Sequence, residues 1–547
     1  MTSGRKTPQT EKAHKDQREN NAGGYSFVVD KWCRLERFLI LGAEGGTYYV
    51  NERKLVRDNF TSLKECIAED GIKTVEKIVA ISDGGRAPKN DAAIFALAVA
   101  SASDDAATKQ AALEAISKVC RIGTHLFDFL SCAQEFRGWG RGLRRAVAAW
   151  YLEKDAHRLG LQVAKYRQRN GWTHRDVLRK CGGEVAAEGA HQAVLRWVVA
   201  GLDGMGEREI KRGDSVKVYP ALDPETLPKI ILGYEKCKVA SNAREAAQIV
   251  RDFRLTHEMV PSEYLKSKEV WDALLESMPV GALIRNLGRL TALGNLDAFS
   301  EGQKKAVALL TDPVAIKKAR IHPLGVLKAL KQYGMGRGGL GKMTWKPTTK
   351  VSEALEGSFY LAFDAIEPTG KNIVAALDVS GSMDGSWGGK IAGLPGISPR
   401  EAAAAMAMVT VRTEPNHEIQ AFSDTLVPVD ITARDRLADV VRKTSQIRMG
   451  GTDCALPMIW ATRGKIPVDA FYVYTDNETW HGNIHPHQAL EQYRQKMGRD
   501  AKLVVVGMTA TDFTIANPHD AGMLDVVGFD TTAPAVMADF TRQGFGQ

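Results

Sequence analysis

Hydrophobic residues recur every three or four positions through most of the first two thirds of the chain. Segments with this spacing include DAAIFALAVASAS, RRAVAAWYLEK and AREAAQIVRDFRL. Such spacing is typical of amphipathic helices, and short runs of glycine, proline and polar residues separate the segments. Because one amphipathic helix cannot bury its apolar face alone, we expect stacked helical repeats from about Trp32 to Gln332. No fixed period is evident, so an irregular helical bundle stays open.

The pattern changes after Gly334, where a connector rich in glycine and proline leads into short apolar runs. These runs are KNIVAALD, HEIQAFS, AFYVYTD and KLVVVGM, with helical stretches between them. Alternating strands and helices at this spacing predict a parallel, doubly wound sheet. We therefore expect an α + α/β protein.

Three parts of the chain follow from this pattern. Residues 1–24 are polar and without an apolar run, and we expect them to form a disordered tail. The helical-repeat domain is placed at residues 25–367, and the α/β domain at residues 368–547. At 547 residues the chain is too long for a single core, which agrees with more than one domain.

Oxygen-bearing side chains stand at the ends of the predicted strands. Asp378, Ser380 and Ser382 follow the first strand, Thr452 lies in GGTD, and Asp476 ends the strand FYVYTD. Since ligands of such sheets bind at the carboxyl ends of the strands, we expect these side chains at one edge. Oxygen ligands, few of them charged, suit a hard divalent cation, and we expect Mg²⁺. The order of residues resembles the metal-ion-dependent adhesion site of von Willebrand factor A-like domains, where an acidic residue from a partner fills the open metal position.

These and nearby motifs also resemble other kinds of site. A phosphatase of the haloacid dehalogenase type needs a second aspartate at the position of Ser380, so the serine excludes this class of enzyme. The hydroxyls could instead only cap the loop and the next helix. A near P-loop has Met343 where Ser or Thr is required, so we interpret it as a linker. His481, His485 and His487 lie close together in the sequence; Pro486 and the polar setting favour a solvated loop, with a soft-metal site as the alternative. No motif indicates an enzyme active site.

Charge is unevenly distributed between the two main parts. Residues 1–367 carry a net charge of +12 and residues 368–547 one of −4, which suggests that the first part meets a polyanion. The basic excess is concentrated in Glu135 to Lys180. This segment contains twelve Lys and Arg but only four Asp and Glu, with aromatic residues between them. Arginine and lysine bind phosphates, and aromatic rings stack on exposed bases, so RNA with single-stranded or looped segments is the predicted ligand. The aromatic rings taken one by one are expected in the core.

The seven cysteines are scattered and form no CxxC pair, which favours a reducing cytoplasm over a zinc site or a disulfide framework. No run of about 18 apolar residues is present. The first residues lack the apolar region of a secretory signal. We expect a cytoplasmic location.

Motifs from both parts together resemble one family. GRGLRRAVAAWYLEK, VAKYRQRNGWTHRDVLR, EPTGKNIVAALDVSGSM and VYTDNETW are similar to the Ro ribonucleoprotein, the TROVE-domain autoantigen, and its bacterial relatives. The resemblance covers roughly residues 25–545. It implies a closed ring of HEAT-like repeats whose ends are tied together by a von Willebrand factor A-like domain.

The resemblance also implies what the protein binds. Family members bind single-stranded 3′ ends of misfolded small RNAs through the hole of the ring, and Y RNAs on its basic outer surface. In bacterial relatives the Y RNA tethers the 3′ exoribonuclease polynucleotide phosphorylase. We expect a monomer that takes part in RNA quality control and is not an enzyme.

Candidate RNA-binding residues come from the basic stretch and from the family motif. Lys165 and Arg169 match the family's Y-RNA-contacting positions, and the whole candidate set is Arg137, Arg141, Arg144, Arg145, Lys165, Arg167, Arg169, His174 and Arg175. The family often has Leu-Ser-His where this chain reads Lys180-Cys181-Gly182, so a histidine of that surface is missing. The alternative function is a metal-dependent adaptor that captures an acidic partner and binds RNA incidentally.

Overall fold

The computed structural model of the chain describes residues 6–43, 52–182, 185–212, 215–338, 342–363, 366–384, 391 and 396–543. Its first two thirds are mainly helical, as the hydrophobic spacing predicts. The helices are α1 Lys31–Leu41, α2 Glu52–Gly84, α3 Asp91–Ser101, α4 Ala106–Glu114, α5 Ile116–Val119, α6 Gly123–Phe136, α7 Arg141–Leu152, α8 Ala156–Lys165, α9 His174–Cys181, α10 Gly189–Ala200, α11 Lys229–Lys238, α12 Ala243–Phe253, α13 Lys268–Leu275, α14 Val280–Ala292, α15 Glu301–Leu310, α16 Pro313–Lys318, α17 Pro323–Gly334 and α18 Thr349–Leu361.

The last third forms a sheet covered by helices. Its strands are β7 Ile373–Asp378, β8 His417–Phe422, β9 Leu426–Pro428, β10 Ala470–Thr475, β11 Lys502–Gly507 and β13 Met523–Val527. They lie in the order β13-β11-β10-β7-β8-β9. The helices of this domain are α19 Pro399–Thr413, α20 Leu437–Ser445, α21 Leu456–Gly464, α22 Pro486–Met497 and α23 Ala533–Arg542.

The four strands that the sequence predicts, β7, β8, β10 and β11, are parallel neighbours. Every residue of β7, β10 and β11 is buried, because helices cover both faces of the sheet. The edge strand β9 was not predicted and runs antiparallel to β8. It has only three residues, partly exposed and ending in proline, and therefore gives no strand pattern.

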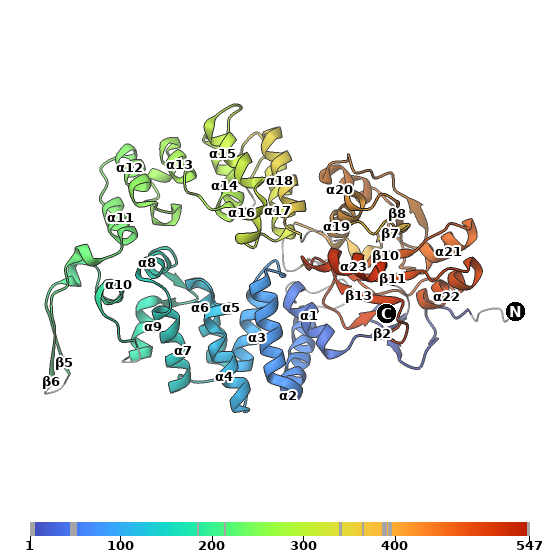
Figure 1. Cartoon of the computed structure of the whole chain (residues 1–547), viewed down its shortest axis with the longest axis horizontal. Coiled ribbons are helices and arrows are strands. Elements are labelled where there is room, and N and C mark those ends of the chain that lie inside the picture. The colour runs from blue at the N-terminus through green and yellow to red at the C-terminus, as the bar shows by residue number, and fades with distance from the viewer. Residues whose placement is uncertain are drawn as a thin grey trace.

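The helical part closes on itself, as a ring does. In Figure 1, α1 to α9 form one row, and α11 to α18 form a second row that returns to the sheet domain. The two ends meet where the Arg320 guanidinium, before α17, lies 2.5 Å from the Asp83 carboxylate near the end of α2. Nearby, the imidazole of His322 makes a 3.1 Å hydrogen bond with the carbonyl of Arg86. The predicted ring of helical repeats joined to an α/β domain is thus confirmed.

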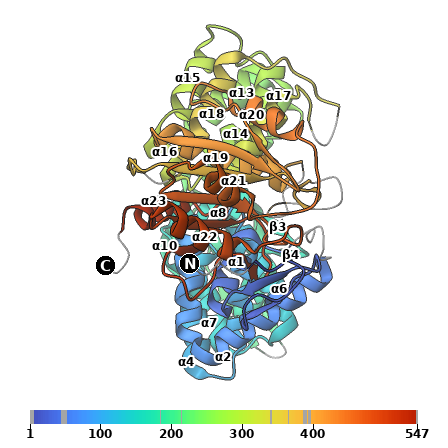
Figure 2. The ribbon, with the colours of Figure 1, turned by 90° about the vertical axis from the view of Figure 1, so that its right-hand side faces the viewer.

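The sheet domain contacts both ends of the helical part. On the α1 side, Arg37 is fully buried and donates two 2.6 Å hydrogen bonds to the carboxylate of Asp525 in β13. On the α17–α18 side, Lys331 lies 2.5 Å from Glu401 of α19. Figure 2, seen from the side of this domain, shows it lying across both rows of helices.

The prediction of a disordered tail is wrong for residues 6–24, and residues 1–5 lie outside the described part. Strand β1, Gln17–Glu19, pairs with β2, Tyr25–Val28, and β2 pairs with β12, Phe513–Thr514, of the sheet domain. The side chain of Gln9 is buried and donates to the Asp453 carboxylate at 2.6 Å. The segment is polar because its polar side chains bind polar groups of the sheet domain, which composition alone does not reveal.

Two hairpins interrupt the helical part and were not predicted. Strands β3, Gln168–Arg169, and β4, Trp172–Thr173, are joined by Asn170 and Gly171, both with positive φ. Asn-Gly is the strongest short hairpin signal, so the sequence does contain the information for this turn. The second hairpin, β5 Arg208–Arg212 with β6 Ser215–Tyr219, projects from the helices in Figure 1. Among the described residues, no helix is long and apolar enough to cross a membrane.

We expect Arg37→Ala to lower the free energy of unfolding by about 3–5 kcal/mol, because it leaves the Asp525 carboxylate without its buried partner. Thermal and urea unfolding of the full chain measure the loss. Lys304→Ala, which removes an exposed ion pair on α15, is the matched control and should leave the midpoint unchanged. Equal losses in the two variants would contradict the anchoring role of Arg37.

Candidate functional site

The predicted metal residues occupy one edge of the sheet, where β7 and β10 end. Asp378 is the last residue of β7, Ser380 and Ser382 follow it, and Asp476 follows β10. All four side chains are buried, as is that of Thr452 in the loop before α21.

Hydrogen bonds bring these residues together. The hydroxyl oxygens of Ser380 and Ser382 are 3.0 Å apart, and the Ser380 N–H donates to Asp378 Oδ1 at 2.9 Å. The carbonyl of Thr452 accepts a 3.1 Å hydrogen bond from the N–H of Trp480, in the loop that follows Asp476. The five side chains predicted from the sequence therefore belong to one connected group of loops.

Two buried carboxylates at this edge repel each other. Burial, with the neighbouring charge of Asp378, raises the pKa of Asp476 to about 7. Burial also raises the pKa of Asp378. A bound cation would offset both effects, because it attracts the charged form of each acid.

The donor set fits a hard divalent cation. Thr452 Oγ1 is buried and makes no hydrogen bond within the described residues, so it is available as a ligand. Serine and threonine hydroxyls with two carboxylates are oxygen ligands of the kind that Mg²⁺ takes alongside water. Within the described ranges, no group of three or more His, Cys, Asp or Glu side chains that could hold a metal ion occurs.

Residues that sequence reasoning missed hold this edge in place. Thr475 Oγ1 donates to Asp378 Oδ2 at 2.7 Å, and the buried Arg400 donates to the carbonyl of Val379 at 2.6 Å. Thr475 directly precedes Asp476 in the strand motif, so its position was visible in the sequence. Arg400 gave no such signal, because only the fold brings α19 under the loop after β7.

The N-terminal segment lies against the same loops. The backbone N–H and the side-chain amide of Asn21 donate to the buried carboxylate of Glu478, at 2.9 and 2.7 Å. The N–H of Glu478 in turn donates to Asp476 Oδ1 at 3.1 Å. The His485 side chain, predicted to be solvated, is buried and lies 2.8 Å from the carbonyl of Glu11. The prediction of a solvated loop is therefore wrong for His485, whereas His481 is exposed and His487 is partly buried.

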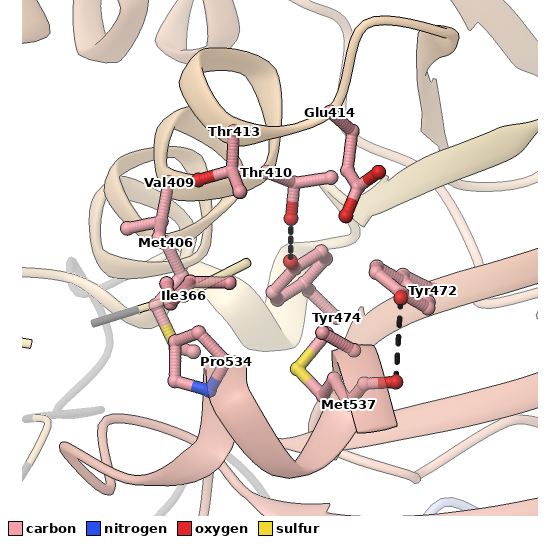
Figure 3. A pocket seen from close by; sticks show the side chains of 11 residues that line it. Ile366, Met406, Val409, Thr410, Thr413, Glu414, Tyr472, Tyr474, Pro534 and Met537 are labelled. Carbon is pink, nitrogen blue, oxygen red and sulfur yellow. Dashed lines mark hydrogen bonds between the residues drawn. The ribbon is translucent and has the colours of Figure 1, made fainter. Parts of the chain in front are cut away.

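A separate pocket lies between α19, β10 and α23 (Figure 3). Tyr474 and Thr410 share a 3.3 Å hydrogen bond across it, and Tyr472 donates to the carbonyl of Met537 at 3.4 Å. Its free volume of about 20 Å³ has room for about one water molecule. The pocket is thus a packing gap under α23, too small for a substrate.

The aromatic residues of the basic stretch are mainly core residues, as expected for each of them. Trp150 and Tyr151 are fully buried in α7, and Trp172 is 8% exposed. Trp139 and Tyr166 are partly buried. Stacking on RNA bases is therefore open only to the last two.

The candidate cations lie at the end of α6, on α7, at the end of α8 and in the segment after it, and on α9. Arg141, Arg144 and Arg145 are exposed on α7, opposite its buried residues, and Arg175 is exposed on α9. Arg137 is half-buried, and its guanidinium donates to the carbonyl of Ser101. Most of the set is accessible to a polyanion.

Three of the candidate cations are held by neighbouring side chains. Lys165 Nζ lies 3.5 Å from Glu258 Oε1, and Arg169 Nε lies 2.9 Å from Asp128 Oδ1. The guanidinium of Arg167 donates to the hydroxyl of Tyr234 at 2.6 Å. These partners come from α6, α11 and the segment after α12, which only the fold reveals.

His174 cannot contact RNA in this structure, and its prediction as a contact residue is wrong. Its ring is 2% exposed, packs against Phe127 and Trp150, and lies 2.8 Å from the hydroxyl of Tyr151. Burial lowers the pKa of His174 to about 3. The residue is the first of α9, and its place in the motif reflects packing of α9 against α7.

Comparisons with known proteins agree on one family. A family model described as the Ro60 vWA domain matches residues 372–541, and one described as the TROVE domain matches residues 18–213 and 248–335. The chain is 42% identical over 537 residues to the RNA-binding protein RO60 of Deinococcus radiodurans, which covers 98% of this chain and 97% of that protein. It is 34% identical over 592 residues to the RNA-binding protein RO60 of Caenorhabditis elegans, over 97% of this chain and 91% of that protein.

A solved structure is similar as well. The crystal structure of the Deinococcus radiodurans RO (RSR) protein aligns with a TM-score of 0.66 and 40% identity. The alignment covers 94% of this chain and 99% of that chain. The agreement extends over both the helical part and the sheet domain.

We expect Mg²⁺ or Mn²⁺ to raise the thermal midpoint of unfolding of the full chain, since a ligand that binds only the folded state stabilises it. Asp378→Asn should abolish this rise. Without metal, the variant should have a thermal midpoint no lower than that of the wild type, because it lacks one of two buried like charges. Asp500→Ala changes an exposed carboxylate and serves as the control. An equal metal response in Asp378→Asn would contradict the site.

We expect the buried His174 to make the chain less stable in mild acid. Between its folded pKa of about 3 and its ordinary value of 6.5, the unfolded chain binds the proton and the folded chain does not. The contribution of the neutral His174 to the free energy of unfolding is therefore fully present above pH 6.5 and is lost as the pH falls from 6.5 toward the folded pKa. His174→Gln should show a smaller drop of thermal midpoint between pH 7 and pH 5. His157→Gln, at an exposed position on α8, is the control, and equal drops in both would contradict this role.

Proposed function

The chain belongs to the Ro60 family of TROVE-domain proteins, and we propose that it is an RNA-binding protein. The observation that carries the proposal is its similarity, over nearly the full length, to two proteins named for RNA binding. The accessible cations of α7 and α9 support it, because arginine and lysine neutralise phosphates and release counterions.

The RNA classes that we propose are small Y-like RNAs and the single-stranded 3′ ends of misfolded RNAs. Lys165 ends α8, Arg169 lies in β3 shortly after it, and Arg175 is exposed on α9. Such a surface supports contacts with the backbone of a folded RNA. A 3′ end would be bound separately, within the ring of helices. The proposed role is RNA quality control in the cytoplasm, as a monomer without a catalytic step, with a 3′ exoribonuclease such as polynucleotide phosphorylase as partner.

The second candidate is a metal-dependent adaptor that captures an acidic protein ligand. The unpartnered Thr452 Oγ1 and the two buried carboxylates favour it, because they supply a divalent cation with ligands. In this proposal Asp378, Ser380, Ser382, Thr452 and Asp476 hold the cation, and the partner's carboxylate completes its shell. The two functions are compatible, since they use different parts of the molecule.

A salt titration tests the main proposal. The probe is a small hairpin RNA with a single-stranded 3′ tail, and the control is the same hairpin with the tail paired. We expect tight binding that needs the free tail and weakens steeply with salt, because phosphate contacts dominate. Weak binding that ignores the tail would contradict the proposal and favour the adaptor.

We expect Lys165→Ala with Arg169→Ala to weaken binding of a Y-like RNA about tenfold or more, and to weaken 3′-tail binding much less. Loss of two phosphate contacts would also make the plot of log binding constant against log salt concentration less steep, by a slope of about two. Fluorescence anisotropy on both RNAs measures this. Lys304→Ala, exposed on α15, is the control, and equal losses for the two RNAs would contradict the two-surface arrangement.

A further inference from the structure

A cavity of about 400 Å³ lies in the helical part, beside the segment that carries Lys165. Its walls come from α8, the first residues of α11, the end of α12, and α14. In Figure 1, α8 and α11 lie near the turn from one row of the ring to the other, and α12 and α14 belong to the second row. Cavities of this size hold drug-sized molecules, whereas the pocket under α23 does not.

The floor of the cavity is apolar. Ile230, Leu255 and Leu274 are almost completely buried there, and Met278 closes the floor from the α13–α14 turn. The partly buried ring of Phe253 stands at the side, with the ammonium of Lys236 5.1 Å from its centroid. A flat apolar group can therefore enter and bury its faces.

Cations surround the mouth. Lys229 and Arg254 are exposed there and have no acidic partner among the described residues, and His157 is exposed beside them. The acids of the wall are engaged: Glu258 with Lys165 at 3.5 Å, and Asp252 with the amide of Gln248 at 2.8 Å. Asp252 keeps its negative charge beside the neutral amide, so the five charged side chains of the lining, Lys165, Lys229, Arg254, Asp252 and Glu258, carry a net charge of +1.

The backbone at Arg254 supports a role for its side chain. Arg254 caps α12 in the left-handed conformation, with φ 51° and ψ 47°, and its N–H donates to the carbonyl of Val250. Glycine is the usual residue at such a cap, because a side chain is strained there. An arginine at this position places a guanidinium at the mouth at the expense of local strain.

We propose that this cavity binds one unstacked nucleotide of a bound RNA, with the base on the apolar floor and a neighbouring phosphate at Lys229 and Arg254. The inference rests on the proposed RNA-binding function and adds a site to it. A base held in a duplex cannot reach the apolar floor of the cavity, so the ligand is a single-stranded or bulged nucleotide. An acidic peptide shares the negative charge but lacks the flat ring that the floor accommodates.

The experiment uses the full chain and a Y-like hairpin RNA whose bulged nucleotide is 4-thiouridine. Arg254→Gly removes the charge and relieves the backbone strain, so this variant should fold. Ser277→Trp fills the mouth from an exposed position without changing charge. Arg244→Ala, exposed on α12 outside the cavity, is the matched control.

We expect Arg254→Gly and Ser277→Trp each to weaken RNA binding about tenfold, with Arg244→Ala unchanged. Ultraviolet crosslinking of the wild-type complex should place the thiouridine on the peptide containing Phe253 to His257, and Ser277→Trp should remove that crosslink.

Three results would overturn the proposal. If the wild type binds RNA but all three variants bind equally and the crosslink lies elsewhere, the cavity is not a nucleotide site and RNA binding stands. If an Asp- and Glu-rich peptide protects the cavity while RNA does not crosslink there, the occupant is a protein. If the wild type binds no RNA, the proposed function fails, and this inference with it.

Discussion

The buried ion pair between Arg37 and Asp525 is the interaction on which the rest of the molecule depends. It fixes α1, the start of the helical part, to β13, at the edge of the sheet. The guanidinium also donates to the carbonyls of Thr511 and Phe513, so most of its donors are satisfied. A charge so deeply buried is tolerated only when it is paired and hydrogen-bonded in this way, which makes the docking geometry specific.

A second junction sets the closure of the ring. Arg86 binds the carboxylates of Asp530 in the sheet domain and Glu36 of α1, and its carbonyl meets His322 from the far end of the helical part. Three segments far apart in sequence therefore share one cluster. Through this cluster the sheet domain contacts both ends of the helical part and holds them together.

The parts of this structure that the sequence predicted are those determined by local patterns. The buried parallel strands give continuous apolar runs, and Asp378 and Asp476 follow directly at the ends of two of them. The features that the sequence did not predict depend on contacts with residues far away in the chain. The polar N-terminal segment looked disordered because Glu478, the partner of Asn21, lies 457 residues away. His174 looked like a contact residue because its motif is basic, whereas its ring fills the space between α7 and α9.

The pairing of cations with acids gives the helical surface a means of discrimination. Lys165 and Arg169 are already bound to Glu258 and Asp128, so a phosphate that takes either cation must displace a carboxylate. A randomly placed polyanion gains little from such an exchange, since one charge-assisted contact replaces another. An RNA whose phosphates reach several of these cations at once gains more, because counterions are released together. Arg254 and Lys229 make no ion pair with a carboxylate among the described residues, so in the proposed site a phosphate need not displace an acid from them. In the proposed binding mode, the paired cations select RNAs by the arrangement of their phosphates, and the unpaired cations supply the initial attraction to RNA.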